Sequence, residues 1–243
     1  MERSHIPLTK WLLAMHLMTS SKKGMSAHQL HRMMGVTYES AWFLAHRLRE
    51  AMKEDVKTSG PLGGEGKFVE ADETVIGGKE RNKRKSRRNP KNIGAVGKQV
   101  VFSLVERGGK ARSHHVANIT AKTLRPIVMA TVSRKLAFMT DDAGQYRNMG
   151  QEFARYETVN HGADEYVRGD AHTNTIEGFF SILKRGIYGV YHHVSEAHLK
   201  RYLVEFDYRY NNRDISDTER AQKALEGIRG KRLMYRRPDE ASH

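Results

Sequence analysis

The 243-residue sequence contains no cysteine. Disulfide bonds, zinc sites built from thiolates and cysteine nucleophiles are therefore excluded, whereas metal sites made of histidines or carboxylates remain open. Long apolar runs are also missing, and no segment approaches the roughly 20 apolar residues that span a bilayer. The first residues, MERSHIPLTKW, mix apolar with charged side chains and have no apolar core of a secretory signal. We therefore expect a soluble, cytoplasmic protein with no membrane partner.

Acidic residues are too few to balance the basic ones. Lys and Arg number 42 against 28 Asp and Glu, which gives a formal net charge of +14. Such an excess produces a long-range field that attracts polyanions, and nucleic acid is the natural partner. The alternative is that the charge only keeps the protein soluble. We favour nucleic acid because the basic residues are concentrated along the chain rather than spread evenly.

The N-terminal region has the pattern of two helices joined by a tight glycine turn. Ser26 with Gln29 predicts the start of the helix AHQLHRMM, Gly35 predicts its end, and Thr37 caps the next helix. This arrangement is typical of a helix-turn-helix whose second helix enters a DNA major groove. An ordinary helical hairpin without a base-reading role is the alternative. The side chains that would face DNA are Tyr38, Glu39, Trp42 and Arg47.

Beyond a segment rich in Gly, Ser and Pro, the hydrophobic period changes from helical to strand-like. The runs KFVEADETVI, QVVFSLVE and ARSHHVA predict three antiparallel strands, and KLAFMTD predicts a fourth after an intervening helix. A mixed sheet with helices packed on it follows, so the fold class is α/β. We expect a helical DNA-binding region at 1–58, a linker at 59–66, an α/β domain at 67–214 and a C-terminal helix and tail at 215–243.

A basic loop, at residues 79–98, separates the first two predicted strands. From residue 81 to residue 91 it has seven basic side chains and no apolar one, so it cannot contribute to a core. We expect it to contact DNA phosphates without reading sequence, with an affinity that falls steeply with salt. A merely solvated loop is the alternative. Its basic residues are Arg81, Lys83, Arg84, Lys85, Arg87, Arg88 and Lys91.

Three acidic residues lie where elements of an α/β fold can converge. Asp72 is in the first strand, Asp141 ends the fourth, and Glu177 lies on the helix after a weaker fifth strand, predicted by YETVNH. Three such groups repel one another, and a hard divalent cation relieves the repulsion. Two Mg²⁺ ions would support an in-line phosphoryl displacement. The alternative is that these are three unrelated solvated acids.

The helix within HTNTIEGFFSILKRG has a polar stripe beside an apolar one. Glu177 and Lys184 are two turns apart, so their side chains emerge from one face about 10 Å apart along the axis. Asn174 shares this stripe, whereas the predicted core side is formed by Ile176, Phe180, Leu183 and Ile187. A surface ion pair would be spaced by three or four residues, so the two charges point to another use.

The runs VEADETVIGGK, LAFMTDDAGQYR and the long segment that begins YVRGDAHTNTIEGFF resemble the DDE transposases of bacterial insertion sequences. The resemblance is greatest to the group whose catalytic domain is called ISXO-like. It implies a ribonuclease-H-like fold in which Asp72, Asp141 and Glu177 bind two Mg²⁺ ions, with Mn²⁺ as a substitute. It also implies that Lys184 contacts DNA near the scissile phosphate and that Asn174 assists as a ligand or DNA contact.

The activity that the resemblance implies is cleavage of transposon ends followed by strand transfer into target DNA. The partner is then double-stranded DNA, the active form a homo-oligomer on DNA, and the location a bacterial nucleoid. Two alternatives remain: a nuclease of the same fold that never joins ends, and an inactive DNA-binding remnant. Related proteins often carry a cysteine-rich zinc ribbon before a segment like IPLTKW.

Several neighbouring residues are harder to assign. Asp142 follows Asp141, but consecutive residues of a strand point to opposite faces, so only one should face the metal ions, and we choose Asp141. Arg185 is expected to contact DNA. Tyr188 and Tyr191 either stack on unpaired bases or pack in the core. The remaining acids near the site are interpreted as solvated or paired bystanders: Glu70, Glu73 and Asp170.

Overall fold

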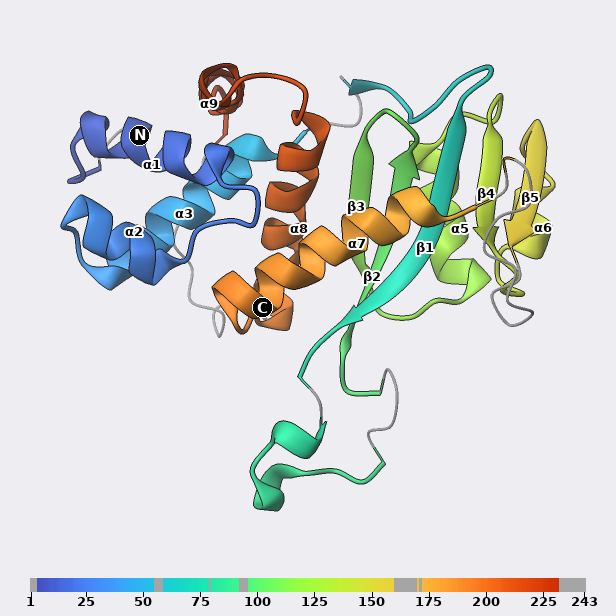
Figure 1. The fold of residues 1–243 in the computed structure, drawn as a ribbon, viewed down its shortest axis with the longest axis horizontal. Helices are drawn as coiled ribbons and strands as arrows, with labels where there is room; N and C mark the ends of the chain where they lie inside the picture. The colour runs from blue at the N-terminus through green and yellow to red at the C-terminus, as the bar shows by residue number, and fades with distance from the viewer. Residues whose placement is uncertain are drawn as a thin grey trace. The chain divides into compact units, whose positions relative to one another are not determined.

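A computed structural model describes residues 4–54, 59–78, 80–91, 96–159, 170 and 172–231. The chain forms two compact units (Figure 1). The sheet unit comprises residues 56–184, and the helical unit comprises residues 1–55 together with 185–243. No helix in the described ranges is both long and apolar enough to cross a membrane.

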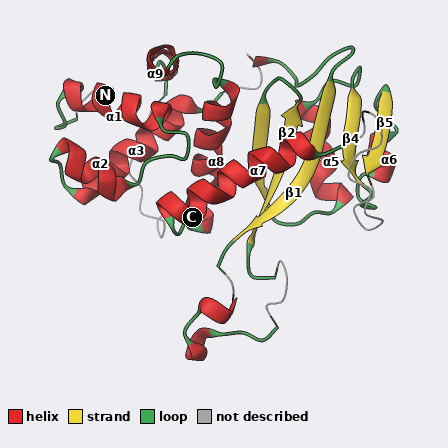
Figure 2. Ribbon diagram, viewed as in Figure 1, coloured by secondary structure: helices red, strands yellow, loops and turns green. Residues whose placement is uncertain are grey.

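The sheet unit is built on one five-stranded mixed sheet with the order β3-β2-β1-β4-β5 (Figure 2). β1 pairs antiparallel with β2, which pairs antiparallel with β3, whereas β4 runs parallel to both β1 and β5. This order and these directions confirm the expected ribonuclease-H-like fold. The strands are β1 (Phe68–Ile76), β2 (Gln99–Glu106), β3 (Ala111–Val116), β4 (Ala137–Asp141) and β5 (Arg155–Val159).

Helices cover both faces of the sheet. α5 (Ala121–Thr131) packs on one face, because alternate strand residues such as Ala71, Phe102 and Phe138 form a buried core with it. On the opposite face, α7 (Asn174–Gly186) begins against β1 (Figure 1). The short α6 (Arg147–Gly150) precedes β5, and two single turns, η1 (Glu80–Asn82) and η2 (Lys85–Arg87), lie in the basic loop.

The helical unit confirms the predicted caps. The Ser26 side chain accepts a hydrogen bond from the Gln29 amide, Thr37 accepts one from Ser40, and Gly35 is left-handed with φ 58°. These caps separate two helices that pack together through their apolar stripes. The unit contains α1 (Leu8–Ser20), α2 (Ala27–Met34), α3 (Tyr38–Met52), η4 (Ile187–Tyr191), α8 (Glu196–Asn211) and α9 (Asp217–Glu226).

A buried charge network joins α3 to α8. Glu205 is fully buried, its Oε2 accepts a hydrogen bond from Arg49 Nε at 2.6 Å, and its Oε1 accepts one from the Tyr191 hydroxyl at 2.6 Å. Arg209, one turn further along α8, also pairs with this carboxylate. Because buried charges are costly unless paired, the network makes the association of these helices specific to this arrangement.

The compact units divide the chain differently from the sequence-based division. Residues 185–214, predicted to belong to the α/β domain, group with the N-terminal helices because Glu205 pairs with Arg49 across the chain. The predicted linker at 59–66 is part of the sheet unit. Leu62 is buried there, and its amide donates to the Thr131 carbonyl at 2.7 Å.

Candidate active site

Asp72 and Asp141 project from neighbouring parallel strands. The register pairs Phe68 with Ala137 and Glu70 with Met139, and the same offset brings Asp72 level with Asp141. Residues that are level on adjacent strands of a sheet point to the same face. The two aspartates therefore emerge side by side.

The face that carries these aspartates is the one against which α7 begins. Glu70 lies two residues before Asp72 and so shares its face. Its Oε2 accepts a hydrogen bond from the backbone amide of Ile176 at 2.9 Å. Glu177 follows Ile176 directly and is exposed. The fold thus brings the third predicted carboxylate to the side of the sheet that holds the other two.

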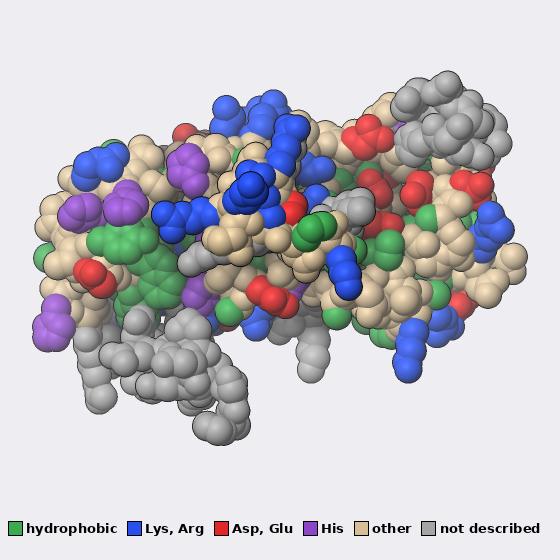
Figure 3. All heavy atoms as spheres, turned by 90° about the horizontal axis from the view of Figure 1, so that it is seen from below, with side chains coloured by type: hydrophobic (Ala, Val, Ile, Leu, Met, Phe, Trp, Pro, Cys, Tyr) green, Lys and Arg blue, Asp and Glu red, His purple; other side chains and the backbone are tan. Residues whose placement is uncertain are grey.

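The electrostatics of Asp72 reflect this proximity. Burial is the main cause that raises the pKa of Asp72 to about 7, and the negative charges of Glu73, Asp141 and Glu177 raise it further. A hydrogen bond from the Glu73 amide to Oδ1, 2.7 Å long, opposes the shift. Acidic side chains also gather on the surface of the sheet unit in Figure 3. The predicted triad is therefore close enough for its members to repel one another.

Thr173 orients the Glu177 carboxylate. The Thr173 hydroxyl donates to Glu177 Oε1 at 3.0 Å, and the Glu177 amide donates to the Thr173 carbonyl at 3.1 Å. Thr173 is 2% exposed, so its own rotamer is restricted by packing. The position of Glu177 is consequently defined by the first turn of α7 and not by a freely rotating surface side chain.

The donor set suits hard divalent cations, which prefer carboxylate oxygens and neutralise mutually repelling acids. Within the described ranges, no group of three His, Asp or Glu side chains is already spaced to hold one ion. A two-ion arrangement does not require such a group, because each ion takes two protein carboxylates and completes its shell with water and substrate oxygens. The chemistry of the residues therefore fits Mg²⁺ or Mn²⁺.

Two of the acids interpreted as bystanders are paired. Glu73 pairs on the sheet face opposite to that of Asp72, and Asp170 pairs at the surface. The Glu73 carboxylate accepts hydrogen bonds from the Tyr146 hydroxyl and from Gln145 Nε2, the latter at 2.9 Å, and burial is the main cause that raises its pKa. The Asp170 carboxylate lies 3.6 Å from Arg155 Nη1. These findings agree with a paired role for both.

Glu70 is also paired, and of the two interpretations given for it, solvated or paired, the second is correct. It is fully buried, and Arg107 Nε donates to its Oε1 at 2.6 Å while its Oε2 binds the start of α7. The sequence carries a signal for this pairing. A glutamate inside the apolar strand FVEADETVI, on the same face as Asp72, needs a buried partner.

The choice of Asp141 over Asp142 agrees with the strand geometry. Asp142 follows the end of β4, its side chain is 40% exposed, and its Oδ1 lies 3.5 Å from Arg147 Nη2. One Asp141 oxygen, Oδ1, is buried. The two adjacent carboxylates thus occupy different environments, and only that of Asp141 is level with Asp72.

The helix α7 has the predicted two stripes. Its apolar stripe is buried, and the predicted core residues are joined there by Phe179. Asn174 and Glu177 are exposed, and Lys184 is half-buried. The contacts of Asn174 and Lys184 with DNA or metal remain predictions.

The basic loop presents its charges to solvent. All described basic side chains between residues 80 and 91 are exposed, and the side chain of Arg87 lies outside the described ones. Glu80 organises the loop, because it pairs with Lys83 at 2.7 Å and accepts a hydrogen bond from the Asn89 amide at 2.7 Å. Arg88 donates to the carbonyls of Arg81 and Lys83. Phosphate contacts by the loop remain a prediction.

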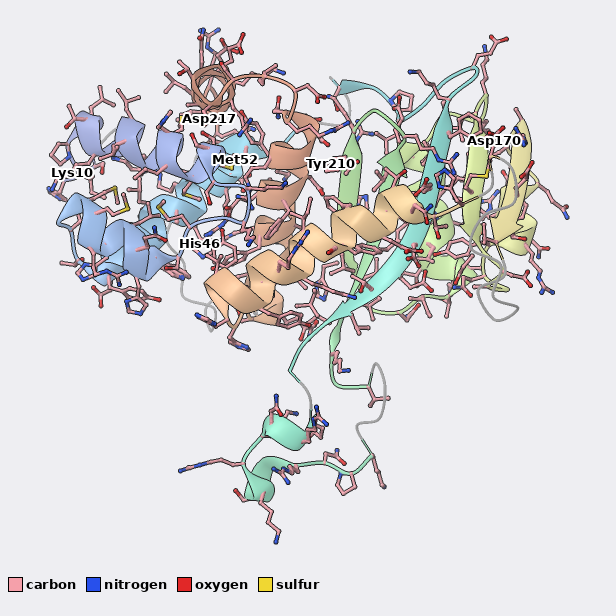
Figure 4. All side chains as sticks on the ribbon, viewed as in Figure 1. Lys10, His46, Met52, Asp170, Tyr210 and Asp217 are labelled. Carbon is pink, nitrogen blue, oxygen red and sulfur yellow. The ribbon has the colours of Figure 1, made fainter. Side chains whose placement is uncertain are left out.

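The predicted DNA-facing residues of the helical unit differ in exposure. Tyr38 is 39% exposed, and its ring contacts that of His28 at an interplanar angle of 30°, whereas Trp42 is half-buried and packs against His46, labelled in Figure 4. The Arg47 guanidinium lies 4.9 Å from the centroid of the Trp11 ring.

Tyr188 and Tyr191, which follow α7, lie in different environments. Arg185 and Tyr188 are exposed, whereas Tyr191 is engaged in the buried Glu205 network. Core packing is therefore the correct interpretation for Tyr191. For the exposed residues of this unit, DNA contact remains a prediction.

The chain is similar to known proteins in sequence and in structure. A family model described as the ISXO2-like transposase domain matches residues 61–211. An uncharacterized protein in transposable element ISH50 of Halobacterium salinarum is 30% identical over 218 residues, which cover 86% of this chain and 71% of that protein.

Among solved structures, the Mos1 strand transfer complex matches with a TM-score of 0.36 and 11% identity, over 89% of this chain and 74% of that chain. The simian T-cell lymphotropic virus intasome in complex with PP2A regulatory subunit B56 gamma matches with the same TM-score and identity, over 94% of this chain and 76% of that chain.

Proposed function

The chain belongs to the ISXO2-like transposase family, and we propose on this premise that it cleaves DNA at the ends of an insertion sequence and joins them to target DNA. The observation that carries the proposal is geometric: the register places Asp72 and Asp141 level on adjacent strands, and α7, which carries Glu177, begins against the same face. Acids from two strands and one helix rarely converge without opposite charge unless a cation binds there.

In this proposal, Asp72, Asp141 and Glu177 hold two Mg²⁺ ions, for which Mn²⁺ can substitute. When bound, such ions supply Lewis-acid stabilisation of the attacking and leaving oxygens of an in-line displacement. Lys184, two turns beyond Glu177 on α7, places a positive charge along the same face and contacts a nearby phosphate. The chain's own task is to hold these groups rigidly, since phosphoryl transfer depends on positioning and charge stabilisation.

The DNA partner is double-stranded, and the exposed basic loop binds its phosphates. The formal charge of +14 and the exposure of the loop side chains support this assignment. Tyr38, Trp42 and Arg47 on α3, and Arg185 after the site, are further contacts that we assign to DNA. Two transposon ends must be brought together, so the active form is a homo-oligomer on DNA.

Replacement of Asp72 by Asn tests the site. We expect Asp72→Asn to lose cleavage of element-end DNA by about a thousandfold or more, because several kcal/mol of transition-state stabilisation depend on the ions. Salt-sensitive DNA binding should persist. Asp142→Asn is a matched control that removes a neighbouring carboxylate from an exposed position and should retain cleavage. Equal activity of Asp72→Asn and the wild type would remove Asp72 from the site.

A second substrate separates a transposase from a nuclease. We expect the protein, given a precut end with a free 3′-hydroxyl and Mg²⁺, to join that end to a target duplex. Cleavage of uncut ends without any joined product from precut ends would establish a nuclease instead. Salt-sensitive binding with neither reaction would indicate a DNA-binding remnant.

A further inference from the structure

An ion pair between Glu70 of β1 and Arg107 lies beside the start of α7. Glu70 is fully buried, and a buried carboxylate is costly unless its oxygens are paired. Arg107 Nε donates to Glu70 Oε1 at 2.6 Å, and His172 Nδ1 lies 3.3 Å from the same oxygen. The other oxygen accepts the Ile176 amide at 2.9 Å. Oε2 is thus bonded to the start of α7, and Oε1 to Arg107, which lies between β2 and β3.

Arg107 extends this connection to the backbone before the helix. Its Nη1 donates to the Asp170 carbonyl at 2.7 Å, and its Nη2 donates to the His172 carbonyl at 2.8 Å. Asp170 is labelled in Figure 4. The planar guanidinium therefore holds the carboxylate and two carbonyls in one fixed geometry, which a lysine could not do.

At the start of α7, a residue of β1 takes the role of the helix cap. The first amides of a helix have no partner within it, and the side chain before the helix normally accepts one of them. Here Glu70, from the strand, accepts the amide of Ile176, the third helical residue. The hydroxyl of Thr173, which precedes the helix, instead donates to the Glu177 carboxylate.

We propose that Glu70, Arg107 and Thr173 are positioning residues that fix the Glu177 carboxylate relative to Asp72 for divalent-cation binding. Glu70 lies two residues from Asp72 on the same strand face, so the strand that supplies one ligand also holds the helix that supplies another. Thr173 then sets the direction of the carboxylate. The inference rests on the proposed function, because it assigns a task toward the ions.

Mn²⁺ binding to the metal-free protein, followed by electron paramagnetic resonance of free Mn²⁺, provides a readout independent of catalysis. We expect Thr173→Val to raise the Mn²⁺ dissociation constant about tenfold, as is typical when a partner that orients a ligand is removed. Thr173→Ser keeps the hydroxyl and should restore affinity. Thr175→Val, the same change two residues later, should bind like the wild type.

A double-mutant cycle identifies the residue through which Thr173 acts. In a Glu177→Ala background, Thr173→Val should change the Mn²⁺ dissociation constant less than about twofold, because its partner is already absent. An equal loss in both backgrounds would overturn the inference. So would wild-type affinity of Thr173→Val in the presence of Glu177.

Glu70→Gln tests the strand side of the connection. We expect about tenfold weaker Mn²⁺ binding, together with faster hydrogen exchange in the first turn of α7, while Glu106→Gln in β2 serves as the matched control. Unchanged exchange and affinity in Glu70→Gln would contradict its positioning role. If Glu70→Gln does not fold, the Thr173 cycle still decides the inference.

The inference and the proposed function fail in different ways. A wild type that neither binds Mn²⁺ nor cuts DNA would overturn both. A wild type that binds Mn²⁺ and loses affinity in Glu177→Ala, but not in Thr173→Val, would overturn the inference alone.

Discussion

Two carboxylates, the fully buried Glu205 of the helical unit and the half-buried Asp72 of the sheet unit, are treated in opposite ways by the fold. Burial of Glu205 tends to raise its pKa, but Arg209, Arg49 and the Tyr191 hydrogen bond outweigh burial, so the pKa lies below its usual value. Burial of Asp72 also raises its pKa, and there the neighbouring charges are negative and add to the effect. Glu205 is neutralised by the protein itself, whereas Asp72 is surrounded by like charge.

The difference separates a structural charge from a functional one. A paired buried charge belongs to the architecture, because removal of one partner leaves the other uncompensated. A half-buried cluster of one sign makes the folded state less favourable, and such clusters occur where a cation or substrate supplies the missing charge. The same carboxylate-to-amide substitution should therefore have opposite effects on stability in the two units.

The largest expected effect is that of Glu205→Gln on the helical unit. Loss of the charge leaves Arg49 and Arg209 buried and uncompensated, which should lower the free energy of unfolding by about 3–5 kcal/mol. Both tryptophans of the chain lie in this unit, so fluorescence-detected urea unfolding reports on it alone. Glu50→Gln removes a half-buried partner 4.0 Å from the exposed Lys53 and should cost less than about 1 kcal/mol. Equal losses of unfolding free energy in Glu205→Gln and Glu50→Gln would contradict a structural role for the Glu205 charge.

A buried neutral group should show the next largest effect. His46 is fully buried, and burial first, then the charges of Arg49, His198 and Arg201, lower its pKa to about 2. The unfolded chain binds a proton near pH 6.5 and the folded one does not, so stability falls as the pH drops below 6.5. Between pH 7 and pH 5 the wild type should lose about 2 kcal/mol more than His46→Phe. Parallel pH profiles from tryptophan fluorescence would contradict this.

Asp72→Asn should stabilise the metal-free sheet unit at pH 8. The folded pKa of about 7 exceeds the unfolded value of 3.8, so the folded state retains a proton that the unfolded state releases. Stability contributed by the protonated group is complete below about pH 4 and is lost as pH rises to 7. Because water partly screens Asp72, we expect a gain of roughly 1–2 kcal/mol at pH 8 and none at pH 4.

Hydrogen exchange of peptides from β1 and β4 in EDTA measures this gain. Addition of Mg²⁺ should remove the advantage of the variant, because the ion neutralises the wild-type site. A destabilised Asp72→Asn at pH 8 would place Asp72 with Glu205 among the structurally paired charges.

The smallest expected effect concerns the basic loop, whose positive side chains are exposed to solvent. Arg84→Gln should reduce the slope of log affinity against log salt for duplex DNA by about 1 without changing sequence preference. Lys135→Gln removes an equally exposed charge just before β4, at the end of that strand opposite Asp141, and should leave the slope unchanged. Equal slopes for Arg84→Gln and the wild type would remove this residue from the interface.

The sequence predicted features whose causes are local or periodic. The caps at Ser26 and Thr37, the limits of β2 and the pairing of its hairpin with β3 follow from side chains a few residues apart. The buried stripe of α7 followed from helical periodicity. The preference for Asp141 over Asp142, which stays a prediction, rests on the alternation of strand residues.

Features that depend on distant pairs could not be read from spacing. Glu205 meets Arg49 across 156 positions, and Glu70 meets Ile176 across 106, so neither the membership of α8 in the helical unit nor the role of Glu70 had a local signal strong enough to identify the partner. The composition of residues 59–66 suggested a linker, but Leu62 joins the core. Gly and Pro indicate a turn, but they do not indicate whether the residues of that turn pack against the core.

Anomalous diffraction from crystals soaked in MnCl₂ tests the central claim most directly. We predict Mn²⁺ peaks contacted by carboxylate oxygens of Asp72, Asp141 and Glu177 at about 2.0–2.2 Å, and loss of these peaks in Asp72→Asn. Peaks that avoid these three side chains, or the same peaks in Asp72→Asn, would contradict the proposal that the three acids share divalent cations.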